Sequence, residues 1–414
     1  MENSTNKKIW LINHYAMPPE YEPRLRTIKF AEYLTKAGYD VTVFAASSMH
    51  NMRLNLITNK DKYIVKYYGI IKFVHIRTVT YNNYIQRVIN HFQFVFRLMK
   101  IAKKFEKPDI ILQTALVPFN SLIYFLAKRY KAKYLVEVLD LWPFSFQATG
   151  VISKYNPILP ILYSFEKWQY KKADCLIFSM EGGKNYIIEK RWDKANKGPI
   201  DLNKVHYINN GVDLKEFQDN LLKYKVDDDD VNNPNTFKIL YIGSIRLFNN
   251  VKLLIEAAEK LFEHKNIIFL IYGDGKERQE LEQYVKSKKI SNVKFKNTII
   301  DKKYIPYLLT KSSVNVLNYQ QNDVWKYGWS QSKMHQYLAA GRPIVANIVP
   351  AYCPIREYNC GISNEFKTSD DYALAFLTIK ESSEEIYHRM CENALEAARN
   401  FDYSKLTDDL IKLF

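Results

Sequence analysis

Short runs of apolar residues alternate with longer amphipathic stretches along the whole chain. Short apolar runs bounded by polar and turn-forming residues predict β-strands, whereas apolar residues that recur every three or four positions predict α-helices. The expected strands are residues 9–12, 41–45, 73–76, 110–112, 134–138 and 176–178, followed by 239–242, 267–271, 293–295, 314–317 and 344–346. The expected helices include residues 25–37, 85–105, 251–261, 279–286 and 332–340.

Strands and helices alternate in two successive series, which is the pattern of parallel sheets with helices on both faces. A chain of 414 residues is too long for one compact core and fits two or three domains. We therefore expect an α/β protein with two Rossmann-like, doubly wound domains that face each other across a cleft. The expected division is 1–200, 201–385 and a C-terminal helix, 386–414, that packs back on the first domain. The acidic and turn-forming segment 227–235 is expected to be an exposed loop.

Charge is distributed unevenly between the two halves. Residues 1–200 contain 31 Lys and Arg against 15 Asp and Glu, whereas residues 201–414 contain 29 of each, so the net charge of +16 lies in the first half. Such an asymmetry predicts a polyanionic partner for the first half, either an anionic membrane leaflet or a nucleic acid. A genome biased towards Lys and Asn is the alternative, although it would act on both halves. Zinc-ligand spacing and an aromatic RNA-binding signature are both missing, so no nucleic acid is expected as a partner.

Neither a leader nor a metal centre is indicated by the sequence. The chain has no run of 18 apolar residues, and the first strand is followed by His14 and the pair Pro18-Pro19, so we expect neither a signal peptide nor a membrane span. The expected location is the cytoplasm. The four cysteines have no CxxC spacing, and we expect them to be reduced thiols rather than metal ligands or disulfides.

The stretch 84–107 is the best candidate for contact with a membrane surface. Its apolar residues recur at helical spacing, and a basic amphipathic helix with aromatic residues can lie in an anionic headgroup layer. The alternative is that the apolar stripe packs on the first sheet. The stripe consists of Ile85, Val88, Ile89, Phe92, Val95, Phe96 and Met99, and the basic residues are Arg87, Arg97, Lys100, Lys103, Lys104 and Lys107.

Ligands of open parallel sheets bind beyond the carboxyl ends of the strands, and three segments of the second half follow such strands. Residues 241–246 bring Gly243, which allows close approach, together with Arg246, which suits phosphate oxygens. Residues 271–276 contain Gly273 and Gly275 in a strand-to-helix turn. For both segments the alternative is a plain tight turn.

The third segment, residues 330–346, reads as a helix that ends at Gly341 and is followed by a buried strand. Ser330 or Ser332 is expected to cap its start, and Lys333 nearby suits an anionic ligand. A purely structural helix, turn and strand is the alternative for this segment.

In combination these segments resemble glycosyltransferase family 4. The resemblance is carried by YIGS (241–244), YGDGKERQELE (272–282), SKMHQYLAAGRPIVA (332–346) and HYINNGVDLKEF (206–217), which follow the family's order. Residues 10–47 resemble the family's acceptor domain, and VEVLDLWPFSF (136–146) resembles the subgroup of WbuB-like aminosugar transferases of surface polysaccharide synthesis. Together the similar segments lie between residues 8 and 365.

The resemblance implies the GT-B fold, a nucleotide-sugar donor in the second domain, no metal or other cofactor, and transfer with retention of configuration. Gly243 matches the glycine before the family's phosphate-binding Arg and Lys. Those two positions are Ser244 and Asn249 here, and we expect Arg246 and Lys252 to substitute for them.

The family's pair of donor-binding glutamates is also altered. The second Glu corresponds to Gln336, which can hydrogen-bond a ribose, and the first corresponds to Gly328, which has no side chain for the sugar. Lys326, Trp329 and Lys333 are the alternatives near Gly328 for contacting the donor sugar. Glu357 resembles a later family Glu near the sugar or ribose.

In the first half the resemblance points to acceptor-binding residues. Asp140 replaces the family's usual His after a strand, and it is our candidate for a general base or for orienting the acceptor; a turn cap is its alternative. His14 is a second catalytic candidate, although a packed or exposed His would look the same. Arg24, Arg26 and Trp142 are expected to bind the acceptor, with a solvated face as the alternative for the two arginines.

The function expected from the resemblance is transfer of a sugar, possibly an N-acetylated aminosugar, from a UDP-sugar to a membrane-held, polyprenyl-diphosphate-linked saccharide. Such a step belongs to capsule, O-antigen or exopolysaccharide synthesis at the inner face of the cell membrane. Two alternatives stay open: a nucleotide-sugar epimerase with the GT-B fold, and a catalytically silent module that binds sugar nucleotides.

Overall fold

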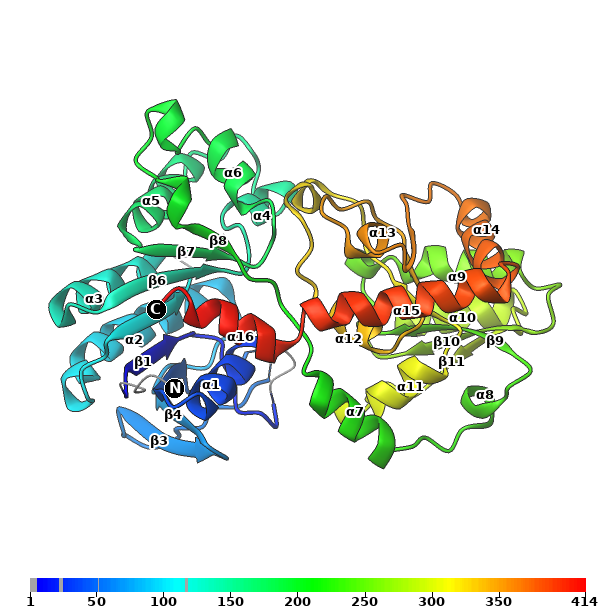
Figure 1. The fold of residues 1–414 in the computed structure, drawn as a ribbon, viewed down its shortest axis with the longest axis horizontal. Helices are drawn as coiled ribbons and strands as arrows, with labels where there is room; N and C mark the ends of the chain where they lie inside the picture. The colour runs from blue at the N-terminus through cyan, green and yellow to red at the C-terminus, as the bar shows by residue number, and fades with distance from the viewer. Residues whose placement is uncertain (1–5, 22–24, 51, 116–117) are drawn as a thin grey trace. The chain divides into compact units, whose positions relative to one another are not determined.

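The structure is a computed structural model that describes residues 6–21, 25–50, 52–115 and 118–414. The chain folds into two compact units, which we call unit 1 and unit 2 (Figure 1). Unit 1 comprises residues 1–209 and 403–414, and unit 2 comprises residues 210–402. Each unit has a central sheet with helices on both faces, so the expectation of two doubly wound α/β domains is confirmed.

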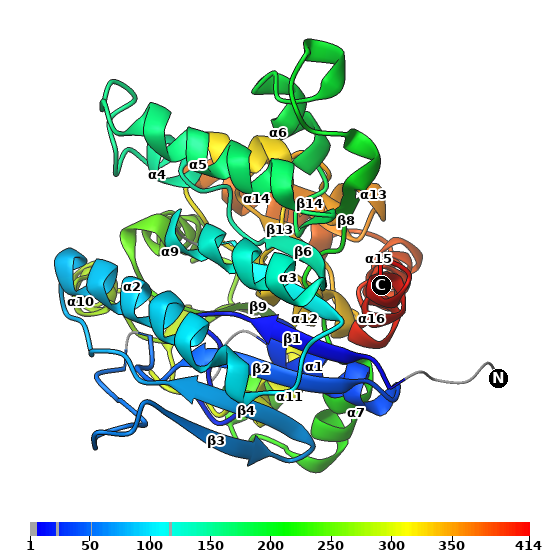
Figure 2. The ribbon, with the colours of Figure 1, turned by 90° about the vertical axis from the view of Figure 1, so that its left-hand side faces the viewer.

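Unit 1 is built on an eight-stranded sheet with the order β3-β4-β2-β1-β5-β6-β7-β8, in which only β3 is antiparallel to its neighbour. Alternate residues of each strand face opposite sides: Ile9 and Leu11 of β1 pack against α1 and α16, whereas α2 and α3 cover the other face (Figure 2). The strands are β1 (Lys8–Ile12), β2 (Asp40–Ala46), β3 (Tyr63–Tyr68), β4 (Ile71–Ile76), β5 (Ile110–Thr114), β6 (Lys133–Val138), β7 (Cys175–Phe178) and β8 (Val205–Tyr207). The helices are α1 (Arg26–Lys36), α2 (Tyr84–Ile101), α3 (Tyr124–Tyr130), α4 (Phe144–Ala148), α5 (Leu159–Lys172), α6 (Gly183–Glu189) and α16 (Tyr403–Ile411), with 3-10 turns η1 (Ala102–Lys104), η2 (Pro118–Ile123), η3 (Lys194–Asn196) and η4 (Leu202–Lys204).

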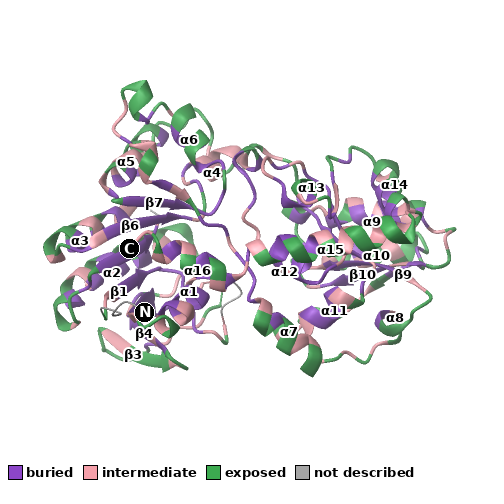
Figure 3. Cartoon of the chain, in the orientation of Figure 1, coloured by how far each residue is buried: buried purple, intermediate pink, exposed green. Residues whose placement is uncertain are grey.

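Unit 2 is built on a six-stranded parallel sheet with the order β11-β10-β9-β12-β13-β14. Its inner strands are mostly buried on both faces (Figure 3), which explains why they read as continuous apolar runs. The strands are β9 (Phe237–Ile242), β10 (Ile267–Tyr272), β11 (Val293–Phe295), β12 (Val314–Leu317), β13 (Ile344–Ala346) and β14 (Gly361–Ser363). The helices are α7 (Leu214–Lys223), α8 (Asp229–Asn232), α9 (Val251–Lys260), α10 (Arg278–Ser287), α11 (Ile305–Lys311), α12 (Ser332–Ala339), α13 (Pro354–Glu357), α14 (Ser369–Lys380) and α15 (Glu384–Asn400), with 3-10 turns η5 (Leu247–Asn249), η6 (Lys302–Tyr304) and η7 (Asp323–Tyr327).

The structure draws the borders of the units differently from the sequence. Residues 205–207 form β8, the last strand of the first sheet, so unit 1 ends at Asn209 rather than at residue 200. The helix expected over 386–414 is two helices: α15 stays in unit 2 and packs against α12, and only α16 belongs to unit 1.

The acidic segment 227–235 is not a plain loop. It contains the short helix α8, which is capped by the Asp228 side chain. Lys296 forms ion pairs with Asp228 and Asp230, at 2.8 and 2.6 Å, and ties the segment to the end of β11. Two of the acidic side chains in this segment are therefore neutralised by contacts within unit 2.

No helix within the described residues is long and apolar enough to cross a membrane. The four cysteines are free thiols, three of them buried, and no group of His, Cys, Asp and Glu in the described part of the chain could hold a metal ion.

Candidate functional site

The side chain of Lys333, on α12, ends directly above the backbone of Gly243, at the carboxyl end of β9. A Cβ atom at residue 243 would stand 1.9 Å from Lys333 Nζ and 3.2 Å from the Tyr241 hydroxyl. Glycine is the one residue that leaves room for the ammonium at this point. The two positions, 90 residues apart by their numbers, therefore form one feature at the carboxyl edge of the sheet.

Lys333 is a half-buried cation that makes no hydrogen bond or ion pair to any residue the structure describes. Its ammonium lies 5.5 Å from the centre of the Tyr241 ring. Burial disfavours the charged form and lowers the pKa of Lys333 to about 8. A desolvated cation without a counter-charge is suited to an anionic ligand, whose binding would restore the favourable charged state.

The start of α12 adds to this positive potential. Its N-cap is Gln331, which makes no side-chain capping bond, and its first turn contains no acidic residue. The expected cap Ser330 instead accepts a hydrogen bond from Asn210, with 3.0 Å between Asn210 Nδ2 and Ser330 Oγ. Uncapped N–H groups and the helix dipole both favour an anion here.

Gly273 and Gly275 serve the packing of two loops rather than a phosphate cradle. Cβ atoms at these positions would lie 1.9 Å from the Gly243 carbonyl oxygen and 2.0 Å from that of Ile245. Their own N–H groups bond to Asn297 O and to the Asp274 carboxylate. The helix that follows, α10, begins only at Arg278. The tight-turn alternative is therefore the correct one for these two glycines.

The other predicted residues of the β9–α9 segment lie on its exposed side. Ser244 and Arg246 are exposed, and the Arg246 side chain makes no hydrogen bond or ion pair to the described residues. Lys252 is also exposed, and its Nζ lies 3.9 Å from Glu256 Oε1. Asn249, at the position of the family's Lys, is buried. Arg246 is thus available for an anion, whereas the structure offers no particular support for Lys252.

The structure places Gln336 and Glu357 in different surroundings. Gln336 is half-buried and lies one helical turn after Lys333, on the same face of α12. Glu357 is exposed at the end of α13, three residues before Cys360, whose carbonyl bonds to the N–H of Ile344 at the start of β13. Glu357 therefore lies towards the amino ends of the strands, and the structure offers no particular support for the prediction that it binds the donor.

Two tyrosines at this edge were missed by the sequence analysis. Tyr241 donates a hydrogen bond to the Ser244 carbonyl, at 2.6 Å, and Tyr337 donates to the Ile242 carbonyl, at 3.3 Å. Both side chains are buried, and both fix the backbone around Gly243. The spacing of four between Lys333 and Tyr337 was the available signal, since it places them on one helix face.

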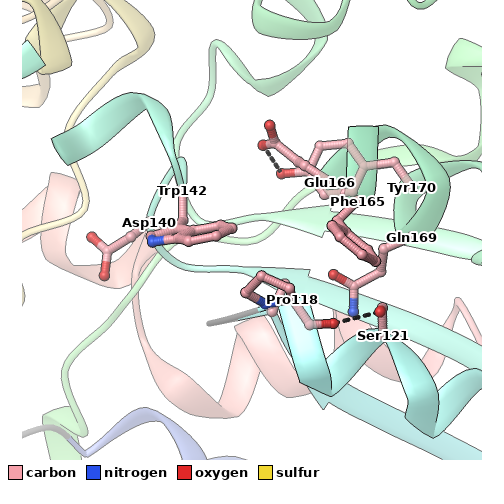
Figure 4. A pocket seen from close by; sticks show the side chains of 9 residues that line it. Pro118, Ser121, Asp140, Trp142, Phe165, Glu166, Gln169 and Tyr170 are labelled. Carbon is pink, nitrogen blue, oxygen red and sulfur yellow. Dashed lines mark hydrogen bonds between the residues drawn. The ribbon is translucent and has the colours of Figure 1, made fainter. Parts of the chain in front are cut away.

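In unit 1, Asp140 follows β6 and is exposed, with its carboxylate pointing away from the other side chains of a small cavity that it borders (Figure 4). Trp142, half-buried and joined to Pro143 by a cis peptide bond, forms one wall. The cavity volume of about 20 Å³ has room for about one water molecule. Asp140 and Trp142 thus mark the carboxyl edge of this sheet, as predicted, beside a cavity too small for a sugar.

A buried acid that the sequence analysis did not identify lines the same cavity. Glu166, on α5, accepts hydrogen bonds from the hydroxyls of Tyr170 and Tyr186, at 2.8 and 2.9 Å. Burial raises the pKa of Glu166 to about 8, so its carboxyl is largely neutral at pH 7. Its helical pattern in the sequence is that of an ordinary exposed Glu, which is why only the structure shows it.

His14 is a packed residue. It is 2% exposed, its Nε2 lies 2.5 Å from Asn90 Oδ1, and its ring stacks on His91 with 3.8 Å between centroids. Burial holds its pKa well below the usual range, so it is neutral. The prediction of a catalytic role for His14 is therefore wrong, because its ring has no access to a ligand.

Of the two arginines predicted to bind the acceptor, the structure describes only Arg26, which is buried within unit 1. Arg24 lies outside the described residues. Arg26 is 3% exposed; its Nε lies 2.7 Å from Glu137 Oε1, and its other nitrogens donate to the carbonyls of Ile208 and Asn209. The structure thus gives Arg26 the role of joining α1, β6 and the end of β8.

Two family models of glycosyltransferases match the chain. Residues 26–216 match the family described as Glycosyltransferase Family 4, and residues 236–380 match the family described as Glycosyl transferases group 1. No curated protein sequence matches the chain.

Solved structures share the fold over 98% of this chain and 98% of theirs. They include sucrose-phosphate synthase from Thermosynechococcus elongatus, with 18% identity and a TM-score of 0.73, and a trehalose-6-phosphate protein from E. coli bound with UDP-2-fluoro glucose, with 12% and 0.72. HepE from Anabaena in complex with UDP has 12% identity and a TM-score of 0.65. At these identities the similarity shows the fold.

Proposed function

Because the chain is a glycosyltransferase of the family-4 type with the GT-B fold, we propose that it transfers a sugar from a UDP-sugar to a membrane-held, polyprenyl-diphosphate-linked saccharide. The transfer retains the configuration at the anomeric carbon, as the resemblance to family 4 implies. A UDP-linked N-acetylated aminosugar is the proposed donor, and synthesis of capsule, O-antigen or exopolysaccharide is the proposed pathway.

The observation that carries this proposal is the Lys333 ammonium above Gly243 in unit 2. The diphosphate of a nucleotide sugar becomes more negative as its bond to the sugar breaks, and fixed positive groups nearby lower the energy of that transition state. Lys333, the exposed Arg246 and the uncapped start of α12 supply such groups. UDP is proposed as the nucleotide because similar folds have been solved with UDP or a UDP-sugar.

On the acceptor side, Asp140 is the proposed group that orients or deprotonates the attacking hydroxyl. It is exposed at the carboxyl end of β6, where ligands of parallel sheets bind. Trp142 next to it offers an aromatic face for a sugar ring. Neither His14 nor Arg26 takes part, because both are buried in contacts within unit 1.

The membrane part of the proposal rests on α2. Tyr84, Ile85, Val88 and Phe92 of this helix are between 48% and 74% exposed, and Lys100, Lys103 and Lys104 follow at its end. Basic residues beside exposed aromatic and aliphatic side chains are typical of surfaces that lie in an anionic headgroup layer. We propose that this face holds the enzyme at the inner side of the cell membrane.

A second candidate function is a silent module that binds a nucleotide sugar without transferring it. Gly328 favours it, since this residue has a φ of 110° and no side chain where the family has a carboxylate. A protein of this kind would bind UDP-sugars yet release no UDP when a lipid-linked acceptor is added.

The first experiment is a thermal-shift screen with UDP, GDP, ADP and UDP-sugars. A ligand present at 100 times its Kd adds about 2.7 kcal/mol of stability, so a shift with UDP that exceeds those with GDP and ADP is expected. Lys333→Met and Arg246→Ala should each reduce the UDP shift, and Lys252→Ala should leave it nearly unchanged. Equal thermal shifts with UDP for the wild type and Lys333→Met would show that Lys333 does not bind the donor.

A further inference from the structure

A second cavity opens in unit 1, next to the first turn of α2. Its volume is about 520 Å³, which is within the range of small-molecule sites. Two segments form it, one after β2 and one between β4 and α2. Its lining residues are Met49, His50, Met52, Arg53, Thr80, Tyr81, Asn82, Asn83, Tyr84 and Arg87.

The lining is cationic without any acidic counterpart. It includes two arginines and a histidine but neither Asp nor Glu among the residues just named. Arg53 is exposed and makes no bond to the residues that the structure describes. The first turn of α2 also lacks an acidic residue, so the dipole of this helix adds to the positive potential. The amide, hydroxyl and phenol groups among the lining residues can hydrogen-bond an oxyanion, and two methionines complete the walls.

Arg87 is held in place by a buried polar cluster behind the cavity. Its Nε donates to the Tyr15 hydroxyl at 2.8 Å, and this hydroxyl lies 2.8 Å from Nε2 of His91. His91 is 2% exposed, and burial together with the charge of Arg87 lowers its pKa to about 3. The cluster is therefore neutral, and the positive charge of Arg87 is left for a ligand.

We propose that this cavity binds a phosphate group, and that the group belongs to the diphosphate of the lipid-linked acceptor. Arginine recognises phosphate oxygens in a bidentate way, and Arg53 and Arg87 reach the same cavity from two different segments. Tyr84 and Ile85, each 74% exposed, and Val88, 53% exposed, lie on the adjoining turns of α2. An anionic site bordered by exposed apolar side chains fits a ligand whose phosphates are attached to a hydrocarbon chain.

The phosphate chemistry follows from the cavity itself, whereas its assignment to the acceptor rests on the proposed function. A phospholipid headgroup would offer the same phosphate chemistry from another source. The test therefore uses three probes: inorganic pyrophosphate, farnesyl diphosphate, and vesicles of phosphatidylcholine with phosphatidylglycerol. All measurements use the full chain with Lys333→Met, so that the cation in unit 2 does not contribute.

In calorimetric titrations we expect pyrophosphate and farnesyl diphosphate to bind, and Arg53→Gln and Arg87→Gln each to weaken both about tenfold or more, as expected for loss of a charged hydrogen bond. Arg129→Gln, an exposed arginine at the end of α3, is the matched control and should change nothing. Arg87→Lys, which keeps the charge but loses the bond from Nε to Tyr15, should also weaken binding. The Arg53 side chain has no hydrogen-bond or ion-pair partner among the described residues, so its variant stays informative even if Arg87→Gln unfolds.

Pyrophosphate and farnesyl diphosphate that bind the arginine variants as tightly as the parent, or that do not bind at all, would overturn the proposal. If pyrophosphate and vesicle binding respond to the two arginines but farnesyl diphosphate binding does not, the phosphate site stands and the acceptor is rejected as its source. The proposed donor function is tested separately, since UDP binding to the Arg53→Gln protein with Lys333 intact should be normal.

Discussion

Lys333 and Gly243 show how one residue depends on another far along the chain. The side chain at one position fills the space that a Cβ atom would need at the other. A larger residue at 243 would displace the ammonium, so Gly243→Ala should resemble Lys333→Met in losing nucleotide affinity. The sequence marked both positions as candidates but gave no reason to connect them.

The lowered pKa of Lys333 predicts how UDP binding depends on pH. In the free protein this pKa is about 8, and a bound diphosphate raises it because the anion stabilises the ammonium. UDP affinity should therefore be nearly constant from pH 6.5 to 7.5 and fall about tenfold per pH unit above 8, with proton uptake on binding. Calorimetry in buffers of different ionisation enthalpy measures both. A flat profile for the wild type up to pH 9 would contradict the role of Lys333.

Asp140 is the residue whose replacement should separate chemistry from donor binding. Asp140→Asn keeps the size and removes the base, so turnover should drop by about 100-fold or more, with an unchanged thermal shift by UDP. Glu166→Gln, in the same cavity but bonded to two tyrosines, is the comparison and should affect turnover less. Near-normal turnover of Asp140→Asn with a lipid-linked acceptor would remove it from the site.

At the scale of elements, the apolar stripe that the sequence predicts for α2 is not the face of this helix that packs on the core. The residues that face the core are Phe94, Val95, Leu98 and Ile101, together with Asn90 and His91. Most of the predicted stripe, including Ile85, Phe92 and Phe96, is instead exposed. The alternative in which that stripe packs on the sheet is thus wrong, and the apolar side chains are left for a contact outside unit 1.

The α2 surface predicts binding to anionic vesicles. Each basic residue near such a surface contributes about 1 kcal/mol. Changing Lys100, Lys103 and Lys104 to Glu should therefore weaken the affinity for phosphatidylglycerol vesicles, measured by sedimentation, by about 100-fold or more. Changing the exposed Lys265, Lys286 and Lys289 of unit 2 to Glu alters the net charge equally and is the control. Equal loss of vesicle binding in both triple variants would mean that net charge alone, and not the α2 surface, causes the binding.

At the scale of the whole molecule, the chain returns to the first unit at its end. Tyr403, Leu406 and Leu410 of α16 are buried in the core of unit 1 beside α1. The fold of unit 1 is therefore complete only after unit 2 has been synthesised, since residues 210–402 separate its two parts.

Replacing a buried leucine of α16 should destabilise unit 1. Leu406→Ala is expected to lower the free energy of unfolding by about 2–5 kcal/mol, whereas Asp408→Ala, at an exposed position of the same helix, should change it by less than about 0.5 kcal/mol. Denaturant unfolding checks both. UDP affinity of the folded Leu406→Ala protein should be normal, because the donor residues lie in unit 2.

The sequence by itself determined the two α/β units, because buried parallel strands and amphipathic helices leave periodic patterns that depend only on local burial. It missed β3, an edge strand with exposed Lys66, and the three-residue strands β8 and β14, whose patterns are too short or too polar to recognise. Local patterns also located Arg246 and Asp140 after strands and Lys333 at the start of a helix. The tertiary structure alone decided that His14 and Arg26 are buried, that Glu357 lies towards the amino ends of the strands, and that Arg53 and Arg87 share a cavity. These facts depend on which side chains meet across the fold, and no spacing along one segment encodes that.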